Sequence, residues 1–235
     1  MCGRYYVATE EEVAEMREII EDVARNLGAS PAEAAVKTGE IFPTDCAPVL
    51  APPFLPAAQT AARPAAWSAA QPAAQPAAWP AAWSAQSGWQ WRLARWGFPH
   101  WQSKRPIINA RSETAAEKPM FRRALQVSRC AVPAAGFFEW KRAGGKATKE
   151  KYLFRRADGR MLYMAGLVDV FRGEGTGAYE AFTILTAAAN ESVADIHDRM
   201  PVILAREELG LWAGDMAFVD EAMRRPGPEL ARIAA

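Results

Sequence analysis

Two nucleophiles stand at the start of the chain. Cys2 follows Met1 in MCGRYY, so removal of Met1 would leave one residue with both a free α-amine and a thiol. Their reference pKa values are roughly 7.7–8.0 and about 8.5, so both groups are partly deprotonated near neutral pH. The sequence therefore predicts a reactive centre at Cys2. The competing interpretation is an ordinary residue at a frayed terminus.

Three other stretches hold polar side chains where strand propensity would not place them. Asn109 and Arg111 follow two isoleucines in PIINARSET, and His197 comes just before the apolar run of ADIHDRMPVIL. Glu139 stands between aromatic residues in GFFEWK. A carboxyl group that faces inward there has a raised pKa, which suits it to donate a proton at neutral pH. The alternatives are an outward Glu139 paired with Lys141 and a core histidine bonded to the backbone.

The net charge of +1 conceals two opposed segments. Residues 9–40 hold nine acidic and three basic side chains, whereas residues 92–129 hold nine basic and two acidic ones. The basic segment also contains Trp96, Trp101 and Phe121. Cations for phosphates and flat rings for bases are what a nucleic-acid groove needs. The segment therefore predicts nucleic-acid binding, with a solvated basic face as the alternative.

Composition argues against several other classes of protein. The three cysteines, Cys2, Cys46 and Cys130, form no C-x-x-C pair, and the chain has two histidines. We therefore expect no disulfide framework, no metal centre and no cofactor. No apolar run approaches the roughly 20 residues of a membrane-spanning helix, and no secretory signal precedes Cys2. The expectation is a cytoplasmic protein without a membrane partner.

Hydrophobic periodicity and turn residues indicate the elements that position these groups. A helix is predicted from Thr9 to Leu27, with Thr9 and Glu12 as a capping box and Gly28 as the C-cap. Strands are predicted over 129–142 and 181–190, a hairpin over 151–171 with its turn at 158–159, and a short helix over 205–214. This mixture favours an α+β fold with a largely antiparallel, barrel-like curled sheet and flanking helices.

The composition changes between about residues 52 and 88. Ala, Pro, Gln, Ser and Trp make up nearly all of this segment, and Arg63 is its only charge. Regular proline blocks both helices and sheet ladders, so we expect a disordered or polyproline-like insertion. The chain is thus predicted to form one domain, residues 1–235, with a low-complexity insertion at about 52–88.

Five motifs occur in a fixed order along the chain: MCGR, WGFPHW, INARSETAAEKPMFR, GFFEWK and DIHDRMPVIL. With them the chain resembles the SRAP family of abasic-site processing proteins, also called SOS-response-associated peptidases, over about residues 1–50 and 89–214. Members of that family lose the first methionine, and the cysteine behind it crosslinks to abasic sites in single-stranded DNA. The resemblance implies that Cys2 is the nucleophile and that Asn109, Glu139 and His197 support it.

The resemblance also implies a DNA-binding surface. Arg4 and Arg111 would contact the DNA backbone, while Pro43, Trp101 and Phe121 would wedge against bases beside the lesion. The complete predicted set is Gly3, Arg4, Pro43, Thr44, Trp101, Arg111, Lys118, Phe121, Arg122 and Arg123. Because phosphate contacts and stacking do not read base identity, recognition should not depend on the DNA sequence.

The function implied is that of an abasic-site sensor in the DNA damage response. Glu139 would protonate the ring oxygen of the abasic sugar, and Cys2 would close a thiazolidine on C1′ with its amine and thiol. His197 would assist proton transfers, including lyase-type elimination, and Asn109 would orient the amine or the sugar. The protein would act as a monomer and associate with the nucleoid when bound to DNA. Met1 would be removed by its own peptidase activity or by a general aminopeptidase. The alternatives are an N-terminal-cysteine amidohydrolase and a non-catalytic single-strand-binding module.

Three features depart from the family pattern. The insertion stands where relatives have a short connection, so we expect it outside the core. The C-terminal DEAMRRPGPELARIAA lacks a valine-asparagine stretch found in relatives, which puts the pairing of the last strand in doubt. Asp45 stands where many relatives have asparagine, and its charge is expected to weaken phosphate binding.

Overall fold

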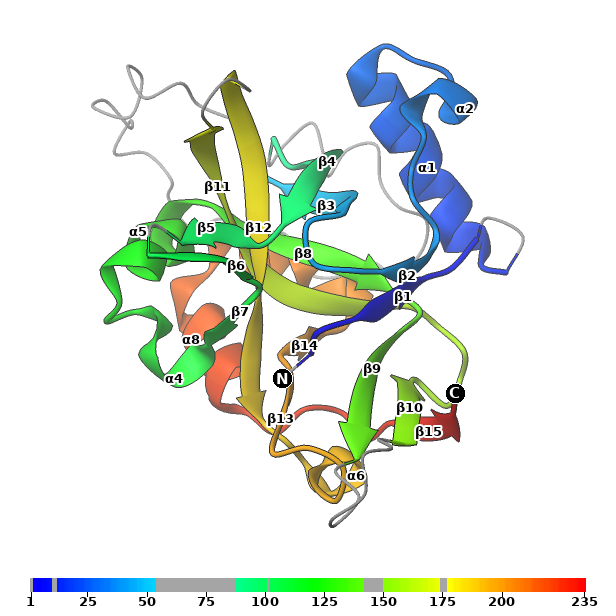
Figure 1. The fold of residues 1–235 in the computed structure, drawn as a ribbon, viewed down its shortest axis with the longest axis vertical. Helices are drawn as coiled ribbons and strands as arrows, with labels where there is room; N and C mark the ends of the chain where they lie inside the picture. The colour runs from blue at the N-terminus through cyan, green and yellow to red at the C-terminus, as the bar shows by residue number, and fades with distance from the viewer. Residues whose placement is uncertain (1, 10–11, 54–87, 101, 142–149, 174–176) are drawn as a thin grey trace.

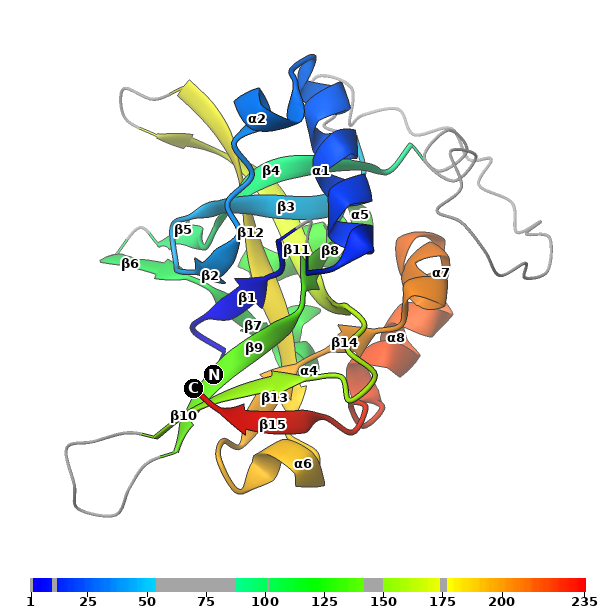
Figure 2. The same cartoon turned by 90° about the vertical axis from the view of Figure 1, so that its right-hand side faces the viewer.

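Two large curled sheets and their flanking helices make up the chain (Figures 1 and 2). The structure is a computed structural model that describes residues 2–9, 12–53, 88–100, 102–141, 150–173 and 177–235. The first sheet contains, in spatial order, β15 (Ala231–Ala234), β10 (Glu150–Arg155), β9 (Gly136–Lys141), β1 (Tyr5–Val7) and β2 (Gly39–Ile41).

The second sheet is longer and contains the two longest strands. Its order is β13 (Arg199–Pro201), β12 (Gly177–Ala188), β4 (Gln90–Trp96), β3 (Cys46–Ala51), β8 (Arg129–Ala134), β11 (Leu162–Gly173) and β14 (Ile203–Leu204). In addition, β7 (Asn109–Arg111) pairs with β12, and β5 (Phe98–His100) forms a small hairpin with β6 (Ser103–Ile107). All pairings are antiparallel except those of β12 with β4 and β7, among the strands that the structure describes.

Helices surround both sheets, as the views from two sides show (Figures 1 and 2). They are α1 (Ala14–Leu27), α2 (Pro31–Ala34), α4 (Ser112–Ala115), α5 (Pro119–Val127), α6 (Glu191–Ala194), α7 (Leu209–Gly214) and α8 (Met216–Arg224), with a 3-10 turn at Arg206–Glu208 before α7. The predicted fold class is confirmed: α+β, largely antiparallel, with barrel-like curled sheets and flanking helices.

The first helix begins later than predicted. The capping contacts are present, since Thr9 N donates to the Glu12 carboxylate at 2.8 Å and Glu12 N donates to Thr9 Oγ1 at 3.2 Å. They close a separate turn, however, because Val13 has an extended backbone and α1 starts at Ala14. The predicted C-cap is confirmed: Gly28 has φ +66, the left-handed conformation that glycine adopts without a Cβ clash.

The predicted hairpin over 151–171 is wrong in its pairing. Both strands exist, but β10 pairs with β9 and β15, whereas β11 pairs with β8, β12 and β14. The 129–142 stretch bends at Ala135, so β8 lies in one sheet and β9 in the other, and β10 and β11 follow the same change of sheet. The Asp158-Gly159 turn therefore connects two sheets instead of closing one ladder. Strand 181–190 and the short helix at 205–214 are found as β12 and as the 3-10 turn plus α7.

The predicted insertion connects β3 and β4, two neighbouring strands of the second sheet. Ala51 of β3 pairs with Gln90 of β4, so the intervening chain joins two antiparallel partners. Residues 54–87 lie outside the described residues. At the other end, β15 pairs with β10 over four residues, so the pairing of the last strand, which the sequence left open, is present. None of the described helices combines the length and apolarity that crossing a membrane requires.

Candidate active site

Cys2 lies three residues before β1 and is fully buried. Its thiol donates to the Arg4 carbonyl at 3.5 Å, and its own carbonyl accepts from Asn109 Nδ2 at 2.8 Å. Burial raises the pKa of the Cys2 thiol well above its usual range, and the charge of Glu139 adds to this shift. The thiol is therefore neutral here, and reaction requires it to be exposed or deprotonated by an acceptor.

Glu139 lies on β9, next to the segment that carries Cys2. Phe138 N donates to the Arg4 carbonyl at 2.9 Å, which continues the antiparallel register beyond Tyr5 and Phe137 and places Glu139 opposite Gly3. The side chain is 2% exposed, as expected for an inward-facing residue between rings. Burial, with a contribution from the Asp198 charge, raises the pKa of the Glu139 carboxyl to about 7.

Asn109 and His197 are both positioned by β12. Asn109 begins β7, which pairs in parallel with β12, and β13 pairs with the other side of that strand. His197 comes two residues before β13, and its Nδ1 lies 3.0 Å from Arg199 N, from which it accepts, and 2.9 Å from Asp198 Oδ1. Arg199 is fixed in turn by the Glu113 carboxylate.

Four segments that are distant in sequence thus meet around the N-terminus. In Figure 1 the N label lies between β7, β9 and β13, which carry or adjoin three of the four predicted catalytic residues. The interactions above link Cys2 to Asn109 directly and to Glu139 through the β1–β9 register and their charges. The charge of Asp198, the residue after His197, raises the pKa of Glu139, so the segment of His197 lies close enough to act on that carboxyl.

The predicted phosphate contact Arg4 lies at the surface beside this cluster. Its Nη1 donates to Glu40 Oε2 at 2.9 Å, and its guanidinium carbon lies 4.2 Å from the Phe42 ring centroid and 5.2 Å from that of Trp140. Sequence reasoning missed Glu40 and Trp140. The alternation of GFFEWK could have placed Trp140 on the face opposite Glu139, whereas nothing local links Glu40 to a residue 36 positions away.

The loop after β2 carries Pro43, Thr44 and Asp45. Thr44 has φ +79, a conformation that β-branched residues rarely adopt, and its N–H donates to the Trp96 carbonyl at 2.8 Å. Asp45 accepts from Phe42 N at 2.8 Å and forms an ion pair with Lys37. The charge expected to weaken phosphate binding is therefore countered by a neighbouring lysine.

The basic segment divides into structural and exposed cations. Arg92 forms an ion pair with Glu180 at 3.0 Å, and buried Arg129 donates to the carbonyls of Trp212 and Ala213. These two arginines have partners within the fold and are not available for the predicted DNA contacts. The exposed predicted contacts are Arg111, Lys118, Arg122 and Arg123, the last of which pairs with Asp169 at 3.3 Å.

One of the predicted base contacts is wrong and another lies outside the described residues. Phe121 is 5% exposed and packs on Phe98, with 6.2 Å between ring centroids. The apolar face of α5 turns it into the core, so it cannot stack on a base without the helix moving. Trp101 is the residue outside the described part of the chain.

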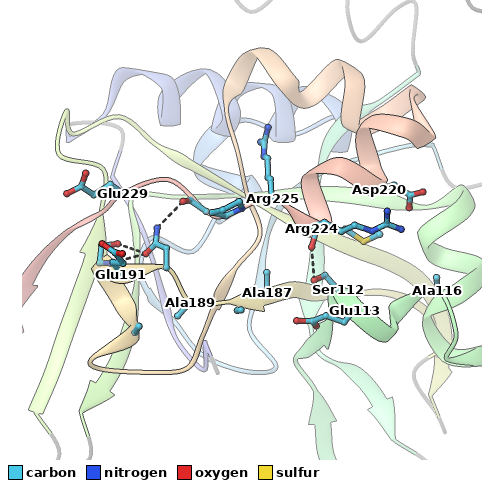
Figure 3. Close-up of a pocket in the computed structure, with 17 residues that line it drawn as sticks. Ser112, Glu113, Ala116, Ala187, Ala189, Glu191, Asp220, Arg224, Arg225 and Glu229 are labelled. Carbon is cyan, nitrogen blue, oxygen red and sulfur yellow. Dashed lines mark hydrogen bonds between the residues drawn. The ribbon is translucent and has the colours of Figure 1, made fainter.

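A groove of about 1140 Å³ lies among α4, α6, α8 and the end of β12 (Figure 3). Its rim mixes acidic Glu113, Glu191 and Asp220 with basic Arg224, and its floor includes Ala187. None of the four predicted catalytic residues lines it. Among the residues that the structure describes, no group of three or more His, Cys, Asp or Glu side chains could hold a metal ion.

Comparison with known proteins decides the family. The family model described as "SOS response associated peptidase (SRAP)" matches residues 1–225. The chain belongs to this family. The match runs from the buried cysteine through β9 and β13, so it covers all the elements that meet around the N-terminus.

Relatives and solved structures agree with this assignment. The chain is 43% identical over 118 residues to the abasic site processing protein YedK of Escherichia coli, covering 50% of this chain and 52% of that protein. It is 30% identical over 147 residues to the mouse abasic site processing protein HMCES, covering 48% and 42%. The chain thus spans about half the length of the curated relatives it matches.

Two crystal structures show the same architecture. A protein from Bacteroides thetaiotaomicron is 30% identical, with a TM-score of 0.55 over 61% of this chain and 68% of that one. A protein from Bordetella bronchiseptica is 23% identical, with a TM-score of 0.64 over 100% of this chain and 99% of that one, which shows the likeness of fold alone.

Proposed function

We propose that this SRAP protein processes abasic sites in single-stranded DNA by crosslinking to them through Cys2 after Met1 has been removed. The observation that carries the proposal is Glu139, a buried carboxyl with a pKa of about 7 that lies opposite Gly3, beside the segment of Cys2. Such a group is half protonated at neutral pH and can serve as a general acid where the N-terminal residue would react. The names of the relatives support the same substrate.

The chemistry follows from the functional groups of one N-terminal cysteine. Glu139 donates its proton to the ring oxygen of the abasic deoxyribose, the C1′–O4′ bond breaks and the C1′ hydroxyl gives its proton to water, so the hemiacetal opens to an aldehyde. The α-amine of Cys2 adds to C1′ and water leaves, giving a Schiff base. The thiol then adds its sulfur to C1′ and its proton to the nitrogen. The product is a thiazolidine, formed with the net loss of one water molecule.

The neighbouring side chains take supporting roles in this proposal. Asn109, already bonded to the Cys2 carbonyl, keeps the nucleophile in place. His197 assists proton transfers at the Schiff base, including a lyase-type elimination. Removal of Met1 by the protein itself is the peptidase step that we propose. The free amine then replaces an amide that could not react.

The DNA contacts form a second part of the proposal. Exposed Arg111, Lys118 and Arg122, with Arg4, bind phosphates. Pro43 and Thr44 follow Phe42, whose ring contacts the Arg4 guanidinium. Because these cations contact the DNA backbone, binding should not depend on the base sequence around the lesion. The chain acts as one domain and as a monomer on single-stranded DNA, at the nucleoid when bound.

A denaturing gel tests the proposed function. The protein is incubated with an abasic oligonucleotide and with an intact oligonucleotide of the same sequence, and intact mass first establishes whether Met1 is present. We expect a covalent species with the abasic strand alone, lost in Cys2→Ala. A Cys2→Ser protein should give at most a less durable adduct, because an oxazolidine hydrolyses more readily. No covalent species, or equal crosslinking by Cys2→Ala, would refute the mechanism.

A further inference from the structure

Glu40 joins two cations from different strands of the first sheet. Its Oε2 accepts from Arg4 Nη1 at 2.9 Å, and its Oε1 accepts from Lys151 Nζ. Glu40 lies on β2, Arg4 immediately precedes β1, and Lys151 lies on β10, with β1 and β9 between the outer two strands. All three side chains are partly buried. The hydrogen bond from Lys151, aided by Arg4, lowers the pKa of the Glu40 carboxyl, so it is charged at neutral pH.

Aromatic rings complete the surroundings of both cations. The Arg4 guanidinium lies 4.2 Å from the Phe42 ring centroid and 5.2 Å from that of Trp140. Lys151 Nζ lies 4.0 Å from the Phe138 ring centroid. A guanidinium between two rings and a carboxylate has lost most of its rotamer freedom before any ligand arrives. The backbone of Phe42 is held as well, because its N–H donates to Asp45.

We propose that Glu40 is a positioning residue, which holds Arg4 between the Phe42 and Trp140 rings and presents its guanidinium to a phosphate beside the nucleotide that Cys2 attacks. This inference rests on the proposed function. Glu40 engages Nη1 and Nε is buried, which leaves Nη2 for the phosphate. Arg4 stands two residues after Cys2, so a shift of its guanidinium displaces the bound strand at the reacting carbon.

Repulsion between the Glu40 carboxylate and the DNA phosphates would have the opposite effect on the crosslinking rate. The positioning role can therefore be told apart from a simple charge effect. If Glu40 acted only through its charge, its removal would strengthen DNA binding and speed crosslinking. If it positions Arg4, its removal slows crosslinking of a saturated complex while the affinity for DNA stays level or rises. The rate constant for crosslinking of the saturated complex therefore separates the two hypotheses: removal of Glu40 raises it under charge repulsion and lowers it if Glu40 positions Arg4.

The test uses Glu40→Gln, which removes the charge and leaves one acceptor oxygen for two cations. Glu40→Asp keeps the charge but is too short to reach both. The matched control is Glu21→Gln, the same change of charge at an exposed site on α1. We expect both Glu40 variants to crosslink about fivefold more slowly at saturating abasic DNA, with unchanged or tighter binding of the intact strand. Glu21→Gln should match wild type in both measurements.

A double-mutant cycle with Arg4→Ala shows whether Glu40 acts through Arg4. In that background Glu40→Gln should cause no further loss of rate, because the group it positions is absent. Equal losses with and without the Arg4 side chain, or a wild-type rate in Glu40→Asp, would overturn the proposal. Thermal unfolding of each variant confirms that it is folded.

Failure of the proposed function would give a different pattern. Wild-type protein that forms no crosslink would refute the function itself, and Glu40 would then be judged by the NMR signal of the Arg4 guanidinium. That signal should be protected from exchange in wild type and Glu21→Gln and exposed in Glu40→Gln. Equal protection in all three would overturn the positioning role.

Discussion

Glu139→Gln replaces a buried carboxyl with a neutral amide of nearly the same shape, and we expect it to raise stability while it lowers activity. Burial, with the nearby Asp198 charge, raises the pKa of Glu139 to about 7 in the folded protein. In the unfolded chain a glutamate has a pKa of about 4.3. As the pH rises between these values, the unfolded state releases its proton first, so the folded state loses stability relative to it. Well above pH 7, where Glu139 is ionised in both states, the loss of folding stability no longer changes with pH.

The size of this effect follows from the two pKa values. Each unit of difference corresponds to about 1.4 kcal/mol, so wild type should be less stable than Glu139→Gln by about 1 kcal/mol at pH 5 and about 3–4 kcal/mol at pH 8. Denaturant unfolding at both pH values measures this. The matched control is Glu117→Gln, an exposed carboxylate whose removal should give no such dependence on pH. A stability difference for Glu139→Gln that is equal at pH 5 and pH 8 would refute the raised pKa.

The crosslinking rate provides the second measurement for the same variant. The protonated fraction of Glu139 falls from about nine-tenths at pH 6 to about one-tenth at pH 8. A reaction that needs this proton and the free amine of Cys2 should therefore have a bell-shaped pH profile. General acid catalysis contributes roughly 10²- to 10⁴-fold, so Glu139→Gln should be at least about 10²-fold slower and should lose the falling limb. Loss of binding to an intact strand would instead make Glu139 a structural residue.

Three further predictions concern the framework and the DNA surface. Gly97 has φ +114 and a Cβ there would lie 2.6 Å from the Pro106 side chain, so Gly97→Ala should cost at least about 2 kcal/mol in denaturant unfolding; a loss below about 0.5 kcal/mol would contradict this close approach. Arg111→Ala should reduce the slope of log affinity against log salt by about 1, and an unchanged slope would remove Arg111 from the phosphate contacts. Deleting residues 54–87 should leave crosslinking unchanged on a gel, since β3 and β4 already pair at Ala51 and Gln90; an inactive deletion protein would contradict our interpretation of the insertion.

Local patterns in the sequence predicted which segments form strands, but they did not predict the partners of those strands. Residues 151–171 carry two strands and a turn signal, and both strands exist, yet each pairs in a different sheet. The partners of β10 and β11 depend on the bend at Ala135, which places β8 in one sheet and β9 in the other. We found no local sequence pattern that predicted this bend. Pairing between residues distant in sequence is decided by the burial of whole faces. A hairpin rule that uses the turn alone therefore fails here.

The same distinction applies to the candidate site. The burial of Glu139 was one of two alternatives, because alternation puts it on the face opposite Phe138 and Trp140 but does not say which face points inward. Phe121 was misplaced, because a phenylalanine in a basic segment suits both a DNA surface and the core, and only the orientation of α5 decides between them. No local feature of the sequence indicated a role for Glu40. Its two partners come from strands on either side of β9, so its role depends on the order of strands in the sheet.

The fold contributes mainly a proton and a fixed position to the proposed reaction. The two nucleophiles of an N-terminal cysteine belong to the residue itself, so a short peptide CGRYY, without Met1, would carry them as well. That peptide would lack a carboxyl with a pKa near 7, which needs the burial that β9 provides, and the bond from Asn109 to the Cys2 carbonyl, which needs β7 beside β12. It would also lack Arg4 held between two rings. The protein should therefore exceed the peptide most with a closed abasic sugar, where ring opening is required, and least with a simple open aldehyde.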